Sequence, residues 1–109
     1  MKFKMNNRNW EIKEMSQDKM REIVNDTTGN GRYFGLCCYD KQLIILDKDL
    51  HVEQKRETLI HELVHCYIGC YISFESMEWT EDSICNLVGN SHDIIHQIVE
   101  KYFKKVLTN

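Results

Sequence analysis

Hydrophobic and polar residues alternate in two short stretches near the start of the chain. Residues 2–5 and 10–15 both alternate, and the polar run 6–9 between them has the composition of a turn. This pattern predicts a β-hairpin. Ser16 then suits the N-cap of a short helix that reaches about Asp26, because apolar residues recur at helical spacing after it.

A second pair of strands is predicted further along the chain. Residues 27–31 hold two of the five glycines and mark a loop. Runs 33–39 and 42–46 are rich in aromatic, β-branched and other apolar residues, and only Asp40 and Lys41 separate them. That separation has the length and chemistry of a tight hairpin, so we expect two neighbouring antiparallel strands.

The second half of the chain predicts three helices. The first covers about 52–72 and has a charged, solvent-facing start, and the segment 73–79 after it is irregular. Thr80 suits the N-cap of a helix that ends near Gly89, and Ser91 suits the N-cap of a long amphipathic helix. We therefore expect an α+β fold, in which a small, mostly antiparallel sheet packs on the 52–72 helix and two further C-terminal helices complete the domain.

Composition and charge narrow the function classes. The chain is 42% hydrophobic and 28% charged, with no linker-like segment, so we expect a single domain over residues 1–109. A net charge of −3 with dispersed basic residues predicts no nucleic-acid partner. No apolar run has signal-peptide length or the roughly 20 residues of a membrane span, so we expect a cytoplasmic protein with no membrane partner. The five cysteines, an odd number without a C-x-x-C pair, are expected to be reduced.

One five-residue pattern, His61-Glu62-Leu63-Val64-His65, carries the candidate chemistry. A chain of this composition would contain about 0.02 such matches by chance. Residues four apart lie on one side of a helix, so both imidazoles can bind one zinc ion at about 2.0–2.1 Å. Glu62 is placed to act as a general base, which accepts a proton from a zinc-bound water and passes it to a leaving amine. The pattern predicts a zinc-dependent hydrolase.

The apolar residues of the same helix place the two histidines at the edge of its buried side. Six apolar residues fall together on one side of the helix: Ile60, Leu63, Val64, Tyr67, Ile68 and Tyr71. His61 and His65 are expected at the rim of that side, and Gly69 leaves room for a cleft above them. Cys66 and Cys70 project away from the histidines, so we expect buried thiols there.

The third metal ligand is expected downstream. A catalytic zinc normally has three protein ligands and a water, and the metzincin third histidine would fall at Tyr71, which excludes that subclass. The remaining source is a carboxylate, Glu81 or Asp82, at the start of the next helix, which would give a gluzincin-like ligand set. A second pair at ligand spacing, His92 and His96, has aspartate where a general base needs glutamate, so we expect an exposed or capping role there.

These motifs resemble the compact zincin peptidases of the ImmA/IrrE type, particularly the small stand-alone versions carried by phages and mobile elements of Gram-positive bacteria. The resemblance covers most of the chain: a strand ending at 44–47, a charged approach, the 58–65 stretch, and an acidic helix start before 84–86. It implies a minimal zincin-like domain. Of these features, the 58–65 motif is specific to the family, whereas the acidic helix start before 84–86 is a loose match.

The resemblance also bears on the third ligand. In that family a glutamate three residues before a small residue, itself followed by Asn or Asp, binds the zinc. Matching Cys85 and Asn86 to that pair implies Asp82 as the ligand, with Asn86 supporting it, although aspartate is shorter than the family's glutamate. Side-chain length and the apolar side of the predicted helix favour Glu81 instead. Both residues stay open.

The function implied by the resemblance is hydrolysis of a peptide bond in a specific cellular or phage regulator, with Zn²⁺ as cofactor and Glu62 as general base. The partner would be this protein or peptide substrate. An alternative from another class is a catalytically inactive zincin-fold binding protein of phage or mobile-element origin.

Overall fold

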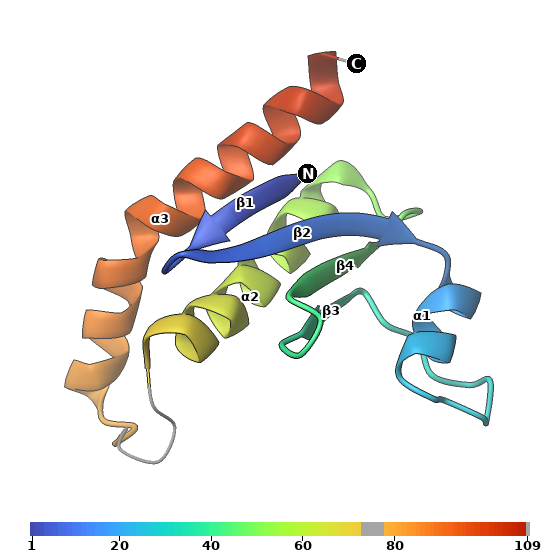
Figure 1. Ribbon diagram of the computed structural model, residues 1–109, viewed down its shortest axis with the longest axis horizontal. Helices are drawn as coiled ribbons and strands as arrows, with labels where there is room; N and C mark the ends of the chain where they lie inside the picture. The colour runs from blue at the N-terminus through green and yellow to red at the C-terminus, as the bar shows by residue number, and fades with distance from the viewer. Residues whose placement is uncertain (73–77, 109) are drawn as a thin grey trace.

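The computed structural model describes residues 1–72 and 78–108, with side chains up to Lys104. The elements in chain order are β1 (Lys2–Met5), β2 (Arg8–Met15), α1 (Gln17–Ile23), β3 (Gly35–Cys38), β4 (Leu43–Asp47), α2 (Val52–Tyr71) and α3 (Glu81–Thr108). The expected α+β class is confirmed: the chain forms a mixed sheet and two long helices. The short α1 follows the end of β2, on the side of the molecule away from α3 (Figure 1). Of the segment expected to be irregular, 73–77 lies outside the described residues.

The described strands form one four-stranded sheet in the order β1-β2-β4-β3. β1 and β2 make the first predicted hairpin, with Phe3 opposite Trp10, and β3 and β4 make the second predicted antiparallel pair. A parallel pairing of β2 with β4, with Ile12 beside Ile44, joins the two hairpins. β1 and β3 are therefore the edges of this sheet.

Local chemistry explains where several elements begin and turn. Asn6 and Asn7 join β1 to β2 with φ angles of 50° and 64°, a left-handed conformation that asparagine tolerates. Ser16 caps α1 as expected, since its Oγ accepts a hydrogen bond at 3.4 Å from the third backbone N–H of the helix. Thr80 precedes α3 and exchanges hydrogen bonds with Ser83 at 2.9 and 3.1 Å.

The main core lies between the sheet and both long helices. Ile44 and Leu46 of β4 are fully buried in it, together with Leu63 of α2 and Val99 of α3. Ile45 projects from the opposite face of the sheet, because successive strand residues alternate, and α1 packs on β4 there. α2 thus has a rigid support along its buried side.

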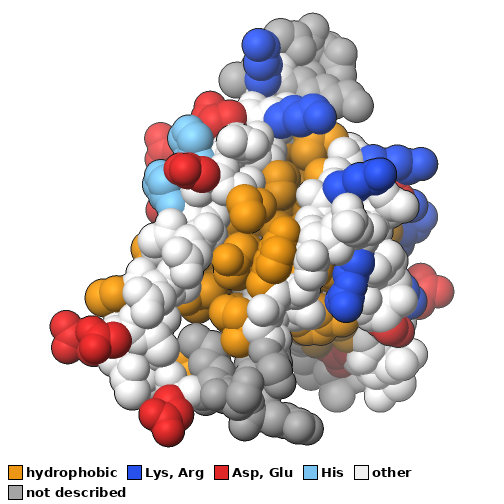
Figure 2. Space-filling model, turned by 60° about the vertical axis from the view of Figure 1, so that its left-hand side comes forward, with side chains coloured by type: hydrophobic (Ala, Val, Ile, Leu, Met, Phe, Trp, Pro, Cys, Tyr) orange, Lys and Arg blue, Asp and Glu red, His pale blue; other side chains and the backbone are white. Residues whose placement is uncertain are grey.

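The edge strand β1 has one polar, exposed face. Lys2 and Lys4 of β1 are exposed, whereas Phe3 and Met5 between them are partly or fully buried, as the alternation predicts. On the face in Figure 2, lysine and arginine side chains lie mainly on one side of a hydrophobic band, and histidines lie on the other. In the described residues, no helix combines the length and the apolar character that crossing a membrane takes.

The expectation of two C-terminal helices is wrong, because α3 is one continuous helix of 28 residues. Ser91, expected as an N-cap, lies inside this helix and is buried, and its Oγ donates a hydrogen bond at 2.6 Å to the carbonyl of Leu87. A serine that bonds to the preceding turn is satisfied without ending the helix. Gly89 also lies inside α3 and does not end it.

Glu14 ties β2 to both long helices. Its carboxylate accepts a hydrogen bond from Lys55 Nζ of α2 at 2.7 Å and another from the Tyr102 hydroxyl of α3. Only 14% of the Lys55 side chain and 26% of the Glu14 side chain are exposed, so this part of the charged start of α2 is structural rather than solvent-facing. Burial and the bond to Glu14 raise the pKa of Tyr102.

We expect Tyr102→Phe to lower the free energy of unfolding by about 1.5–3 kcal/mol, because a partly buried hydrogen bond to a charged acceptor is lost. Urea denaturation measures the change. The matched control is Tyr71→Phe, which removes a hydroxyl that accepts the exposed backbone N–H of Asn6 at 3.0 Å. Equal losses in the two variants would contradict the role assigned to Glu14.

Candidate metal centre

The side of α2 that carries Cys66 and Cys70 faces the core. Cys66 and Cys70 are buried, as expected, and the structure holds both as free thiols. Ile60 and Tyr71, which were expected on the buried side, are 39% and 45% exposed. The cause is that cysteine packs as a small hydrophobic residue, and the fold turns that side of the helix toward the sheet. The orientation of α2 about its own axis decides where the side chains of His61, Glu62 and His65 point.

His61 and His65 lie on the exposed side of α2 with their ring centroids 5.0 Å apart. Two imidazoles that bind one zinc at about 2.0–2.1 Å with near-tetrahedral angles have ring centres about 5 Å apart. The spacing of the two rings therefore fits a shared metal ion. The side chain of His61 is 69% exposed, so an ion can reach it from solvent.

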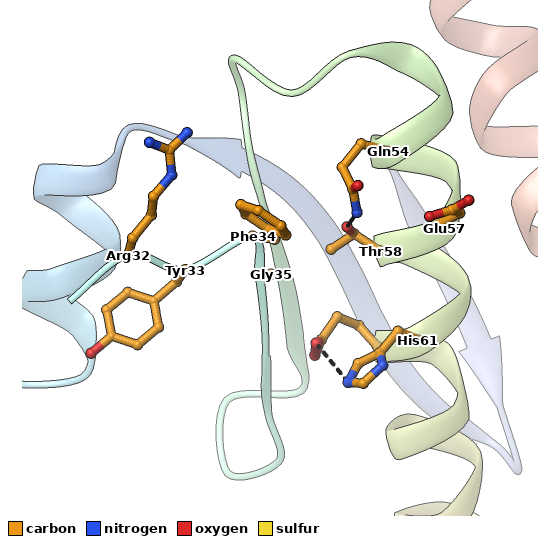
Figure 3. A pocket seen from close by; sticks show the side chains of 9 residues that line it. Arg32, Tyr33, Phe34, Gly35, Gln54, Glu57, Thr58 and His61 are labelled. Carbon is orange, nitrogen blue, oxygen red and sulfur yellow. Dashed lines mark hydrogen bonds and ion pairs between the residues drawn. The ribbon is translucent and has the colours of Figure 1, made fainter.

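Glu62 is buried between α2 and the sheet, with 8% of its side chain exposed. Its Oε1 lies 3.8 Å from His61 Nε2, the contact drawn as a dashed line in Figure 3. Burial raises the pKa of the Glu62 carboxyl, and the nearby His61 and His65 partly offset this effect. A raised pKa brings this group closer to the range in which it exchanges protons near neutral pH.

Gly35 of β3 makes the burial of Glu62 possible. A Cβ atom at Gly35 would lie 2.6 Å from Thr58 Cγ2, 3.0 Å from Glu62 Cγ and 3.3 Å from the Ile45 carbonyl oxygen. Only glycine allows the edge strand to approach α2 this closely.

A pocket of about 580 Å³ opens beside Glu62 (Figure 3). One wall is the segment entering β3, which includes Arg32 and Phe34, and the other wall is α2, with Thr58 and His61. The pocket therefore lies toward the N-terminal half of α2.

The room expected above Gly69 is filled. The ring of Tyr39 lies over this glycine, since a Cβ there would be 2.4 Å from Tyr39 Cε1. The Tyr39 hydroxyl donates a hydrogen bond at 2.9 Å to the backbone carbonyl of His65. The expected cleft position is therefore wrong, because a side chain from the β3–β4 turn occupies it.

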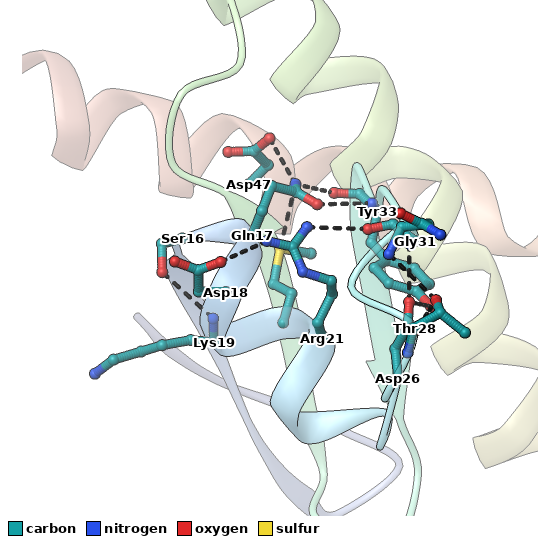
Figure 4. Close-up of polar contacts among 12 residues, drawn as sticks. Ser16, Gln17, Asp18, Lys19, Arg21, Asp26, Thr28, Gly31, Tyr33 and Asp47 are labelled. Atoms are coloured by element: carbon teal, nitrogen blue, oxygen red, sulfur yellow. Dashed lines mark hydrogen bonds and ion pairs between the residues drawn. The ribbon is translucent and has the colours of Figure 1, made fainter.

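Side-chain hydrogen bonds hold the segment that forms the first wall (Figure 4). Gln17 Nε2 donates to the Tyr33 carbonyl at 2.6 Å and to Asp47 Oδ2 at 2.8 Å, and Gln17 Oε1 accepts from the Tyr33 N–H at 2.9 Å. Asp26 accepts hydrogen bonds from the Gly31 N–H at 2.9 Å and the Tyr33 hydroxyl at 3.1 Å. The sequence predicted a loop over 27–31 and a strand from residue 33, whereas β3 begins at Gly35, and the contribution of this segment to the pocket was missed.

Glu81 and Asp82 stand at the start of α3, as expected, and both are exposed. Within residues 1–72 and 78–108, no group of three or more histidine, cysteine or carboxylate side chains comes together to hold a metal ion. His61 and His65 are thus neighbours and Glu62 lies next to His61, but neither Glu81 nor Asp82 forms a metal-holding group with them. His92 and His96 are exposed, with stacked rings 5.8 Å apart.

We expect Gly35→Ala to destabilise the protein by about 1–3 kcal/mol, because the new methyl group overpacks against Thr58 and the backbone of β4. Gly89→Ala is the control: α3 has open space there, and alanine should stabilise the helix by about 0.5–1 kcal/mol. Thermal unfolding measures both. A neutral or stabilising Gly35→Ala would show that β3 does not approach α2 as described.

The raised pKa of Glu62 predicts a pH dependence of stability in metal-free protein. The folded state holds this proton more tightly than the unfolded state, so the contribution of Glu62 is largest at acid pH and is lost as pH rises through the folded pKa. Glu62→Gln should therefore be more stable than wild type at neutral pH, and the difference should vanish near pH 4. Urea denaturation across this range checks it, and a difference independent of pH would contradict it.

The local arrangement combines two histidines at metal-binding spacing, a buried carboxylate with a raised pKa, and an open pocket beside them. A single helix thus presents two side chains of a type that can bind a metal and one that can accept a proton. No protein-family model, curated protein or solved structure matches this chain.

Proposed function

We propose that this chain is a zinc-dependent metallopeptidase that hydrolyses a peptide bond in a specific protein target. The observation that carries the proposal is the placement of Glu62, buried beside the pocket and next to two histidine rings 5.0 Å apart. A general base needs this combination of a raised pKa and access to the reacting atoms.

Each motif residue has a distinct role in the proposal. His61 and His65 would hold Zn²⁺ through ring nitrogens, and Glu81 or Asp82 would supply the third protein ligand. The chemistry that zinc supplies when bound is polarisation of the scissile carbonyl and acidification of water. Glu62 accepts a proton from the attacking water at a carboxylate oxygen and delivers it to the leaving amine.

The sheet offers a place for an extended substrate. β3 is an edge strand of the described sheet, so among the residues that the structure describes no further strand pairs with its outer row of backbone N–H and C=O groups, and Gly35 at its start lines the pocket. A substrate strand along β3 would pass beside Glu62 in the manner of β-augmentation. By the resemblance to ImmA/IrrE-type peptidases, the target would be a cellular or phage regulator.

A second candidate is a catalytically inactive binding protein that keeps the same fold. The observation that favours it is that the described residues gather no third metal ligand around His61 and His65. In that case the pocket and the exposed surface of α2 would contact a host or phage partner without cleaving it.

Metal content and proteolysis separate the two candidates. Wild type, grown and purified with zinc, should hold one zinc per chain, and Glu62→Gln should hold the same amount while cleavage of a peptide library falls by about 10²–10⁴-fold. His61→Ala should lose both zinc and cleavage. His92→Ala is the matched control on α3 and should change neither. Wild-type protein that contains no zinc after growth in zinc-replete medium would contradict the metallopeptidase proposal.

The same assay identifies the third ligand. Glu81→Ala and Asp82→Ala are compared by zinc affinity, and the variant that lacks the ligand should bind zinc far more weakly than the other. Unchanged affinity in both would show that neither acid is a ligand.

A further inference from the structure

Arg32 brings a positive charge to the pocket beside Glu62. It lines the wall opposite α2, and Figure 3 shows it on the segment that leads into β3. Among the described residues, its recorded contact is with the ring of Phe34, 6.0 Å from the guanidinium carbon to the ring centroid. Arg32 makes no hydrogen bond or ion pair there, so its donors are free for a ligand.

The position of Arg32 is fixed by its neighbours. The next residue, Tyr33, is held at its backbone N–H and carbonyl by Gln17, and at its hydroxyl by Asp26. The preceding residue, Gly31, donates its N–H to Asp26 and accepts from Arg21 Nη1 at 3.1 Å. The backbone that carries Arg32 is therefore anchored on both sides, and its guanidinium lies within cation–π range of the Phe34 ring.

We propose that Arg32 makes this pocket a subsite for an acidic side chain of the substrate, a refinement that rests on the proposed peptidase function. The guanidinium fork matches the geometry of a carboxylate and forms two parallel hydrogen bonds with it. The aromatic ring of Phe34, 46% exposed beneath the guanidinium, adds apolar surface for the methylenes of a glutamate. The substrate class is therefore a peptide that carries Glu or Asp near the scissile bond.

Two carboxylates of α2 line the same pocket: Glu57 carries the competing charge, and Glu62 is the proposed general base. Glu57 is an exposed residue of α2 without a partner among the described residues. A guanidinium forms two parallel hydrogen bonds with a carboxylate, whereas the Glu57 carboxylate meets an ammonium group as a point charge. Arg32 therefore dominates the selectivity of the pocket.

The test uses binding, so that it does not depend on cleavage. Full-length Glu62→Gln protein is immobilised and exposed to an equimolar mixture of three random peptide pools with Glu, Gln or Lys fixed at the central position. Mass spectrometry counts the captured peptides. The Glu pool should be enriched about tenfold over the Gln pool, because a charged hydrogen bond is added. Adding Arg32→Gln should abolish that enrichment, and Arg32→Glu should shift capture to the Lys pool.

Arg8→Gln on β2 is the control: it removes an exposed charge outside the pocket lining, and the enrichment should persist. Circular dichroism confirms that each variant is folded. Capture of all pools alike, preference of the Arg32 protein for Lys, capture of no pool, or Glu enrichment that survives Arg32→Gln would each overturn the inference. Arg32-dependent enrichment by a protein that binds no zinc would instead support the subsite and refute the peptidase.

Discussion

The close approach of β3 to α2 at Gly35 is the contact on which the candidate site depends. With no Cβ at this position, the edge strand lies against Thr58 and Glu62, and the Glu62 side chain is largely buried between helix and sheet. Its raised pKa follows from this enclosure. The same contact sets the mouth of the pocket, because the segment that enters β3 forms the wall opposite α2. A wider separation would hydrate Glu62 and remove one wall.

Polar residues outside the motif fix the elements that meet at this contact. Glu14 joins β2 to α2 and α3 through Lys55 and Tyr102, so the motif helix is held along its charged first half as well as by its buried side. Gln17 and Asp26 hold the pocket wall through the backbone and hydroxyl groups of that segment. These partly buried hydrogen bonds hold the elements around the site in defined positions, which proton transfer by a positioned group requires.

Sequence patterns predicted the features that depend on neighbouring residues. The hairpins, the extent of α2 and the caps at Ser16 and Thr80 follow from alternation, helical spacing and local hydrogen bonding, and His61 and His65 meet because residues four apart share a helix side. Features that join distant residues were not predictable in this way. Tyr39 fills the space over Gly69 from another element, and Ile60 and Tyr71, expected on the buried side of α2, are exposed. The pairing of β2 with β4, and the pocket wall, likewise depend on tertiary packing.

The burial of Glu62 bears on the choice between the two proposed functions. Its side chain is largely buried and also lines the pocket, and burial raises its pKa, so its ionised form lowers the stability of the fold. A protein that used this surface only for binding would gain stability from glutamine or an apolar residue there. A general base, in contrast, needs a carboxylate whose pKa is raised and which still reaches the pocket. The destabilising feature is thus the one that proton transfer requires, which supports the metallopeptidase over the binding protein.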